Sequence, residues 1–273
     1  MKITIVGCGN MGLIYAGAFL KYNIVDRGNL LLVEKSEGRK ENLKKLNTGK
    51  VVVSDDKLIA DSDVIILSVK PQDFTELATD LKKVLNEKTI LLSIMAGINI
   101  SFLQKKLNHQ KIVRAMPNSP VEIGMGITAY SLSKAITIDE AHKVENLLAT
   151  TGRTLYMEDE NLLDAVTALS GSGPAYFFYF VQQLIEAGKK MGMNEATASL
   201  LVKQTMLGSF HLINNAGKPL DELIKAVASK GGTTEAALSS FTKHEVNKHI
   251  QEGLLNAEKR AKELAAQASK TQN

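Results

Sequence analysis

Three glycines near the start of the chain have the spacing to hold phosphate groups. They belong to the segment Gly7-Cys8-Gly9-Asn10-Met11-Gly12, which matches the pattern G-x-G-x-x-G. The segment follows the apolar run Ile3–Val6 and precedes a helical pattern over Met11–Lys21, the context in which this pattern binds a dinucleotide. There the first glycine allows a tight turn, the second lets the backbone approach a pyrophosphate, and the third permits close helix packing. The alternative is a glycine turn that binds nothing, and in either case Cys8 is interpreted as a small packing residue.

Charged residues after the next apolar run bear on which dinucleotide the chain would bind. Glu34 ends that run at the spacing where a carboxylate accepts hydrogen bonds from the adenosine ribose of NAD. The polar residues that follow could instead pair with the 2′-phosphate of NADP, or form an ordinary solvated run; they are Lys35, Ser36, Arg39 and Lys40. The choice between NADH and NADPH therefore stays open.

A second glycine-bearing segment, far downstream, could hold a carboxylate. It reads Ser229-Lys230-Gly231-Gly232-Thr233-Thr234. Its glycines permit a turn whose successive N–H groups point inward at the start of a helix, and the Ser229 hydroxyl could add a donor. The alternative is that the segment only caps a helix, with Thr233 or Thr234 at the N-cap and Glu235 in the first turn. Taken alone, the residues favour this alternative.

Short apolar runs alternate with longer amphipathic stretches and predict the scaffold for the first glycine segment. The expected strands are Ile3–Val6, Leu30–Val33, Val51–Val53, Val64–Val69, Ile90–Ser93 and Ile112–Ala115. Nearly all their positions are apolar, as parallel strands covered by helices on both faces must be. The expected helices between them are Met11–Lys21, Arg39–Leu46, Asp73–Leu85 and Ser101–Leu107. This order predicts an α/β fold with a doubly wound sheet.

After about residue 160 the strand signal disappears and only helical patterns remain. We expect helices from Pro174 to Lys190, over Glu195–Asn214 with Asn194 as its cap, from Pro219 to about Val227, and from Lys243 to Ala268. The sequence therefore predicts two domains, 1–160 for a cofactor and 161–273 all helical. An unbroken apolar run over 176–181 must be buried, either inside its own domain or against a second copy of the chain.

Composition narrows the class of protein. The 273 residues are 44% hydrophobic and 23% charged with a formal net charge of +4, which is ordinary for a globular chain. No apolar run approaches the roughly 18 residues of a membrane span, and no cleavage region follows the first apolar run, so we expect neither a membrane segment nor a signal peptide. The single cysteine favours a reducing, cytoplasmic location. Scattered charge and the absence of tryptophan argue against a nucleic-acid partner.

The five histidines do not form a catalytic or metal-binding set. His244 and His249 are five residues apart, so they do not share one helix face as a metal-binding pair requires. We therefore expect no metal site and no side chain that acts as a strong acid.

Five segments together closely resemble the pyrroline-5-carboxylate reductase family, which catalyses the last step of proline biosynthesis. They are residues 7–12, Val69-Lys70-Pro71-Gln72, the segment R-A-M-P-N-S-P at 114–120, the segment S-G-S-G-P-A-Y at 170–176, and residues 227–234. The resemblance spans about residues 1–260, and S-x-G-G-T-T is its most specific element.

The resemblance implies that NADPH or NADH reduces the C=N bond of 1-pyrroline-5-carboxylate to give L-proline. It implies an N-terminal Rossmann-like domain and an all-α C-terminal dimerisation domain, with homodimers that can assemble into rings. It gives Thr234 a catalytic hydrogen bond to the ring nitrogen and places the substrate against Ser229, Gly231, Gly232 and Thr233. The residues that would line the cofactor toward its nicotinamide are Val69, Lys70, Pro71, Met95, Ala96, Gly97 and Asn118. Two positions depart from the family pattern: Lys230 stands where proline is common, and Asp56 where an asparagine often contacts the adenosine.

Two other functions compete with this interpretation. A β-hydroxyacid dehydrogenase-like oxidoreductase would need a lysine acid from the helical half, where Lys189, Lys190 and Lys203 are the candidates. Lys189 and Lys190 are also explained as favourable charges at a helix C-terminus. The second alternative is a dinucleotide-binding regulatory protein without turnover.

Overall fold

The computed structural model describes residues 1–270, with side chains up to residue 266. The chain forms two compact units, one made of Met1–Ser172 with the residues from Ala257 onward, the other of Gly173–Asn256. The contacts divide the chain after Ser172, somewhat later than the acidic connection near residue 160 at which the sequence pattern changes. Helix α11 (Val246–Lys270) contributes to both units.

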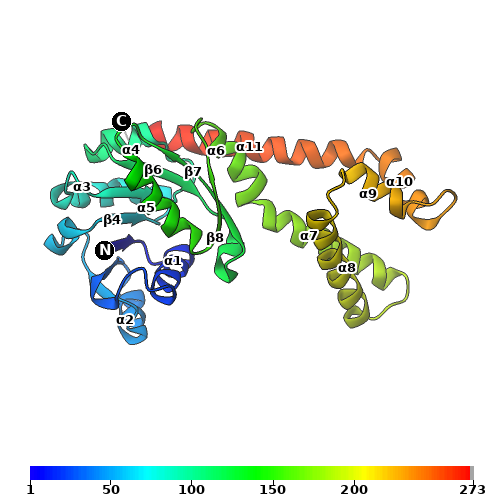
Figure 1. The fold of residues 1–273 in the computed structure, drawn as a ribbon, viewed down its shortest axis with the longest axis horizontal. Helices are drawn as coiled ribbons and strands as arrows, with labels where there is room; N and C mark the ends of the chain where they lie inside the picture. The colour runs from blue at the N-terminus through cyan, green and yellow to red at the C-terminus, as the bar shows by residue number, and fades with distance from the viewer. Residues whose placement is uncertain (271–273) are drawn as a thin grey trace. The chain divides into compact units, whose positions relative to one another are not determined.

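The first unit is built on an eight-stranded sheet with the order β3-β2-β1-β4-β5-β6-β7-β8 (Figure 1). The strands are β1 Ile3–Val6, β2 Leu30–Val33, β3 Lys50–Val52, β4 Val64–Leu67, β5 Ile90–Ser93, β6 Ile112–Met116, β7 Gly126–Leu132 and β8 Gly152–Tyr156. The first six pair in parallel, and β7 runs antiparallel to β6 and parallel to β8. The order reverses beside β1, where β2 lies on one side and β4 on the other. Ligands bind at such switch points, outside the carboxyl ends of the strands.

The six predicted strands are confirmed within two residues at their ends, and so is the doubly wound sheet. The helices of this part are α1 Asn10–Lys21, α2 Glu37–Leu46, α3 Phe74–Val84, α4 Ile100–Leu107, α5 Ile138–Ala149 and α6 Leu162–Val166. Short 3-10 turns include η2 Lys57–Asp61 and η3 Pro71–Asp73, and the π-helical turn η5 spans Thr167–Gly171. Sequence reasoning did not predict β7, α5 or β8.

Alternate residues of each central strand face opposite apolar layers. In β1, Ile3 and Ile5 belong to the layer built with α1 and α5, whereas Val6 belongs to the layer built with α3 and α4. All four residues of β1, β2 and β4 are buried, since helices cover both faces of the sheet. This packing fixes the carboxyl ends of β1, β2 and β4 at one edge.

A buried arginine ties β6 to the segment that leaves the sheet. The guanidinium of Arg114 donates to Asp164 in α6 over 2.6 Å and to Glu160 over 3.2 Å. Glu160 also accepts from the backbone N–H of Ile100 at the start of α4, over 2.8 Å. Three elements are therefore held by one charged cluster.

The second unit holds the helices α7 Gly173–Lys190, α8 Glu195–Asn215, α9 Leu220–Val227 and α10 Thr233–Lys243, together with the first part of α11. As predicted, Asn194 caps α8 by accepting from the N–H of Thr197 over 2.8 Å. Helices α7 and α8 pack through Gly188, where an added Cβ would lie 2.9 Å from the Cβ of Ala198.

Large apolar side chains of this unit stay exposed within the single chain. On α7, Phe177, Phe178 and Tyr179 are each more than half exposed, and so are Leu207 and Phe210 on α8. Burial inside its own unit is therefore not how the aromatic run is covered, which favours the second copy that the sequence left as an alternative. None of the described helices combines the length and apolar character needed to cross a membrane.

Candidate functional site

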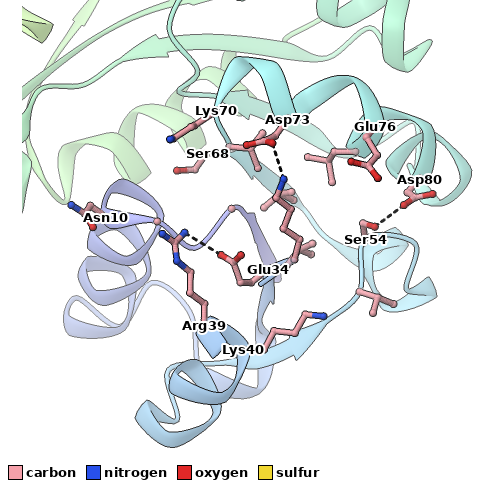
Figure 2. Close-up of a pocket in the computed structure, with 18 residues that line it drawn as sticks. Asn10, Glu34, Arg39, Lys40, Ser54, Ser68, Lys70, Asp73, Glu76 and Asp80 are labelled. Atoms are coloured by element: carbon pink, nitrogen blue, oxygen red, sulfur yellow. Dashed lines mark hydrogen bonds and ion pairs between the residues drawn. The ribbon is translucent and has the colours of Figure 1, made fainter. Parts of the chain in front are cut away.

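A pocket of about 640 Å³ lies at the carboxyl ends of β1, β2 and β4. It is lined by Val6, Gly7, Gly9, Asn10, Val33, Glu34, Lys35, Arg39, Lys40, Val53, Ser54, Ser68, Val69, Lys70, Asp73, Glu76, Leu77 and Asp80. Figure 2 shows Asn10 and Lys70 on its walls and the Glu34 carboxylate in its interior. The pocket occupies the switch point of the sheet, the position at which doubly wound folds bind dinucleotides.

The three glycines of the first segment have different surroundings: two lie in close contacts and one borders open space. Gly7 has φ +92°, and an added Cβ would lie 2.7 Å from Val69 Cγ1. A Cβ on Gly12 would lie 2.3 Å from the carbonyl oxygen of Gly7, so only glycine lets α1 start this close to the turn. A Cβ on Gly9 would have no atom within 4 Å, so it would take up open space at the pocket wall. The surroundings thus leave room for a ligand to approach the backbone at Gly9.

The start of α1 leaves hydrogen-bond donors for an anion. Gly9 is the N-cap residue and carries no side chain that could satisfy the first N–H groups of the helix. These groups and the positive end of the helix dipole favour a phosphate at this point. The residues present therefore fit the pyrophosphate of a dinucleotide.

Glu34 is fixed in the pocket, whereas Lys35 and Arg39 beside it are exposed. Its side chain is only 6% exposed and accepts from the backbone N–H of Ser36 over 3.0 Å. The Arg39 guanidinium, 64% exposed, lies 3.9 Å from the other carboxylate oxygen. Lys35 pairs with Asp73 over 2.7 Å, and this partner raises the pKa of the lysine. Figure 2 shows Glu34 turned toward Arg39, with Asp73 on the other side of the pocket.

Cys8 does not line the pocket and belongs to the apolar core beside it. Its thiol is buried and donates to the carbonyl oxygen of Val33 over 3.7 Å. Burial, with a smaller contribution from the negative charge of Glu34, raises the pKa of Cys8 to about 12. The thiol therefore stays protonated at neutral pH, which agrees with its interpretation as a packing residue.

The structure brings together only some of the residues proposed for the cofactor. Gly7, Gly9, Asn10, Glu34, Lys35, Val69 and Lys70 line the pocket; Cys8, Met11, Gly12, Ser36, Asp56, Pro71, Met95, Ala96, Gly97 and Asn118 do not. Asp56 caps the turn η2, where it accepts from the N–H of Leu58 over 2.9 Å. Gly97 packs against α11, with an added Cβ 3.2 Å from the backbone nitrogen of Ala265.

Asn118 is held by hydrogen bonds at the end of β6. Its side-chain oxygen accepts from the N–H of Ile127 over 3.0 Å, and its amide nitrogen lies 3.3 Å from the Ser170 hydroxyl, to which it donates. Ser170 belongs to the π-helical turn η5, and such turns are frequent at functional sites. The two sequence motifs that contain Asn118 and Ser170 therefore meet.

Several residues that line the pocket were not predicted from the sequence. Ser54 and Ser68 each follow a strand closely, a signal that was available. Asp73, Glu76 and Asp80 lie along η3 and α3, and nothing in their spacing singles them out from a solvated helix face. Their place in the pocket follows from which loops the sheet brings together.

The downstream segment forms a turn that holds a carboxylate. Gly231 has φ +74°, and its backbone N–H donates to the Glu235 carboxylate over 2.6 Å. Gly232 is the N-cap residue of α10, so neither Thr233 nor Thr234 takes the capping position considered above. Thr234 is half-buried in the first turn, and Ser229 is exposed. The turn therefore directs the Gly231 N–H at a carboxylate oxygen, and in this structure that carboxylate is the side chain of Glu235.

Comparisons with known proteins match both parts of the chain. Residues 160–264 match the family model described as pyrroline-5-carboxylate reductase dimerisation, and residues 2–97 match the one described as NADP oxidoreductase coenzyme F420-dependent. The pyrroline-5-carboxylate reductase of Aquifex aeolicus is 38% identical over 266 residues, which cover 97% of each chain. That of Pseudomonas aeruginosa is 33% identical over 267 residues, again 97% of each chain.

Solved structures show the same similarity. The Plasmodium falciparum pyrroline carboxylate reductase with NADP bound superposes with a TM-score of 0.87 at 28% identity, covering 97% of this chain and 98% of that one. The Coxiella burnetii pyrroline-5-carboxylate reductase gives a TM-score of 0.86 at 29% identity, covering 96% and 98%.

Proposed function

This chain belongs to the pyrroline-5-carboxylate reductase family, and from that premise we propose which of its residues carry the reaction. It is an NAD(P)H-dependent oxidoreductase that reduces the C=N bond of 1-pyrroline-5-carboxylate to give proline. The reaction requires that the chain hold a dinucleotide, hold the substrate carboxylate, and favour a protonated ring nitrogen. Bound NAD(P)H supplies the hydride, and the protein contributes positioning and electrostatics.

The cofactor role falls to the pocket at the switch point of the sheet. The N–H groups after Gly9 would hold the pyrophosphate, and Glu34 would face the adenosine ribose. Val69, Lys70 and Asn118 would border the cofactor toward its reactive end, as the family resemblance implies. The observation that supports this most strongly is the open space around Gly9 beside the uncapped start of α1.

The substrate role falls to the turn Ser229–Thr234. Gly231 and Thr233 would offer backbone N–H groups to the substrate carboxylate, with the Ser229 hydroxyl as a further donor. Gly232 would line the same site, while its own N–H donates to the carbonyl oxygen of Ser229 over 3.0 Å and closes the turn. The hydrogen bond from Gly231 to a carboxylate oxygen of Glu235 supports this role, because it places a carboxylate on a backbone N–H group of this turn. Thr234, in the first turn of α10, would hydrogen-bond the ring nitrogen and keep it in its protonated form.

The two proposed domains, which meet near residue 160 where the strand pattern ends, would have different roles. Residues 1–160 would bind the cofactor, and 161–273 the substrate and the second copy of the chain. Self-association is the role of this second part, as the matched dimerisation model indicates. Assembly of dimers into a ring, and a cytoplasmic location, are further proposals, the latter supported by the single cysteine. Sedimentation analysis would give the size of the assembly.

The experiment that tests the assigned roles compares the wild type with Thr234→Ala. The variant should lose rate with pyrroline-5-carboxylate while its affinity for the reduced cofactor, measured by fluorescence titration, stays unchanged. A Thr242→Ala variant, on the exposed part of the same helix, is the matched control. Wild-type turnover in Thr234→Ala would remove Thr234 from the mechanism.

A further inference from the structure

We infer that Glu34 makes this chain prefer NADH to NADPH. The inference rests on the proposed cofactor role of the pocket and settles a choice that the sequence leaves open. Two sets of groups compete for the ribose end of the dinucleotide, the Glu34 carboxylate and the basic side chains around it. In the structure the two sets differ in how deeply they are buried and in whether they already have an oppositely charged partner.

The Glu34 carboxylate is the fixed group. It lies at the end of β2, 6% exposed, with one oxygen bound to the N–H of Ser36. The other oxygen has the Arg39 guanidinium at 3.9 Å, longer than a hydrogen bond, so it remains able to accept from a hydroxyl. A carboxylate that accepts from ribose hydroxyls makes charge-assisted hydrogen bonds, and a phosphate in place of a hydroxyl turns that attraction into repulsion.

Two of the basic side chains of the pocket are already paired with acids. Lys35 pairs with Asp73 over 2.7 Å and Lys40 pairs with Glu37 over 2.7 Å. The pocket lining as a whole carries four basic side chains and four acidic ones. A 2′-phosphate, which carries a charge of about −1.5 to −2 at neutral pH, would therefore enter without an excess of positive charge to receive it.

Arg39 is the group that a 2′-phosphate would recruit, and the negative charge of Glu34 would compete with the phosphate for it. The guanidinium is 64% exposed and lies 3.9 Å from the Glu34 carboxylate, so no hydrogen bond fixes it there. Neutralising Glu34 removes the repulsion of the phosphate and this competition at the same time. One substitution should therefore shift the two dinucleotides in opposite directions.

The test uses ligands that carry only the discriminating half of the cofactor. ADP-ribose and 2′-phospho-ADP-ribose are titrated by calorimetry into the full-length wild type, Glu34→Gln and Glu41→Gln. Glu41→Gln is the matched control, because it makes the same charge change on an exposed side chain of α2 that does not line the pocket. Glutamine at position 34 keeps an oxygen for the N–H of Ser36, and circular dichroism checks that each variant is folded.

We expect the wild type and Glu41→Gln to bind ADP-ribose at least about tenfold more tightly than the 2′-phosphate form, the discrimination that about 1.4 kcal/mol provides. In Glu34→Gln the ratio of the two dissociation constants should fall to near one or invert. The ratio of kcat/KM with NADH to kcat/KM with NADPH should change in the same direction. Equal or tighter wild-type binding of the 2′-phosphate form, or an unchanged ratio in Glu34→Gln, would overturn the inference. If the wild type bound neither ligand, the dinucleotide site itself would be wrong, and the inference would fall with it.

Discussion

Lys35 and Asp73 join the loops that follow β2 and β4 through an ion pair of 2.7 Å at the rim of the dinucleotide pocket. The pair is exposed, with side-chain exposures of 72% and 34%, so its contribution lies in charge balance at the site more than in stability. It neutralises the basic residue directly after Glu34. Sequence spacing gives no hint of it, because the two residues are brought together only by the parallel sheet.

Replacing Asp73 by Asn should free the positive charge of Lys35. We expect Asp73→Asn to bind 2′-phospho-ADP-ribose severalfold more tightly than the wild type, with a smaller change for ADP-ribose, because only the former carries the extra phosphate. The gain should shrink as salt is added, since the charges are exposed. Calorimetric titrations at two salt concentrations measure both effects, and an unchanged affinity for the 2′-phosphate form would contradict the prediction.

The lone cysteine should be unreactive in the folded chain. Its raised pKa, about 12 against an ordinary 9.0, means that the thiolate is scarce even at pH 9, and the thiol is buried as well. Iodoacetamide at pH 9 should therefore leave Cys8 unmodified in the native protein and label it fully in guanidinium chloride, as mass spectrometry would show. Rapid labelling of the folded chain would mean that the thiol is accessible or ionised.

Removing the buried Arg114 guanidinium should destabilise the first unit. Arg114→Ala leaves Asp164 and Glu160 without their cation, and breaking a buried charge cluster of this kind costs about 3 kcal/mol. The midpoint of urea denaturation should fall clearly, whereas Arg153→Ala, an exposed arginine on β8, should leave it nearly unchanged. Equal midpoints for both variants would show that the cluster does not stabilise the fold.

Glu235 should compete with the substrate for the turn at Gly231. Because its carboxylate accepts the Gly231 N–H, Glu235→Gln removes a negative charge from the place proposed for the substrate carboxylate. We expect a severalfold lower KM for pyrroline-5-carboxylate with little change in kcat. Glu222→Gln, on the exposed first turn of α9, is the control. A raised KM in Glu235→Gln would instead mean that this carboxylate holds the turn in its working form.

The central sheet was predictable because its strands are buried on both faces and read as continuous apolar runs. Strands β7 and β8 were missed because they lie at the sheet margin and mix polar with apolar residues, as Arg153 and Thr154 illustrate. Helix α5 did leave a signal in the sequence. Thr137 and Glu140 form a capping box, a spacing that marks a helix start and could have been recognised.

The candidate site was predictable where one short segment determines the geometry. The glycine segment is such a case, because Gly12 is required by a contact within its own strand–turn–helix unit, Gly7 by a contact with the end of the neighbouring strand, and Gly9 borders open space. Asp73 and Ser54 depend on which loops the folded sheet brings together, so local pattern carries no information about them. The burial that distinguishes Glu34 from its exposed neighbours also appears only in the fold.

The most direct measurement follows the absorbance of the reduced nicotinamide when purified full-length protein meets pyrroline-5-carboxylate, with proline quantified by mass spectrometry. Our account predicts that one NADH is oxidised for each proline formed, and that NADPH is used with at least about tenfold lower kcat/KM. If neither NADH nor NADPH were consumed and no proline appeared, the assigned reaction would be contradicted.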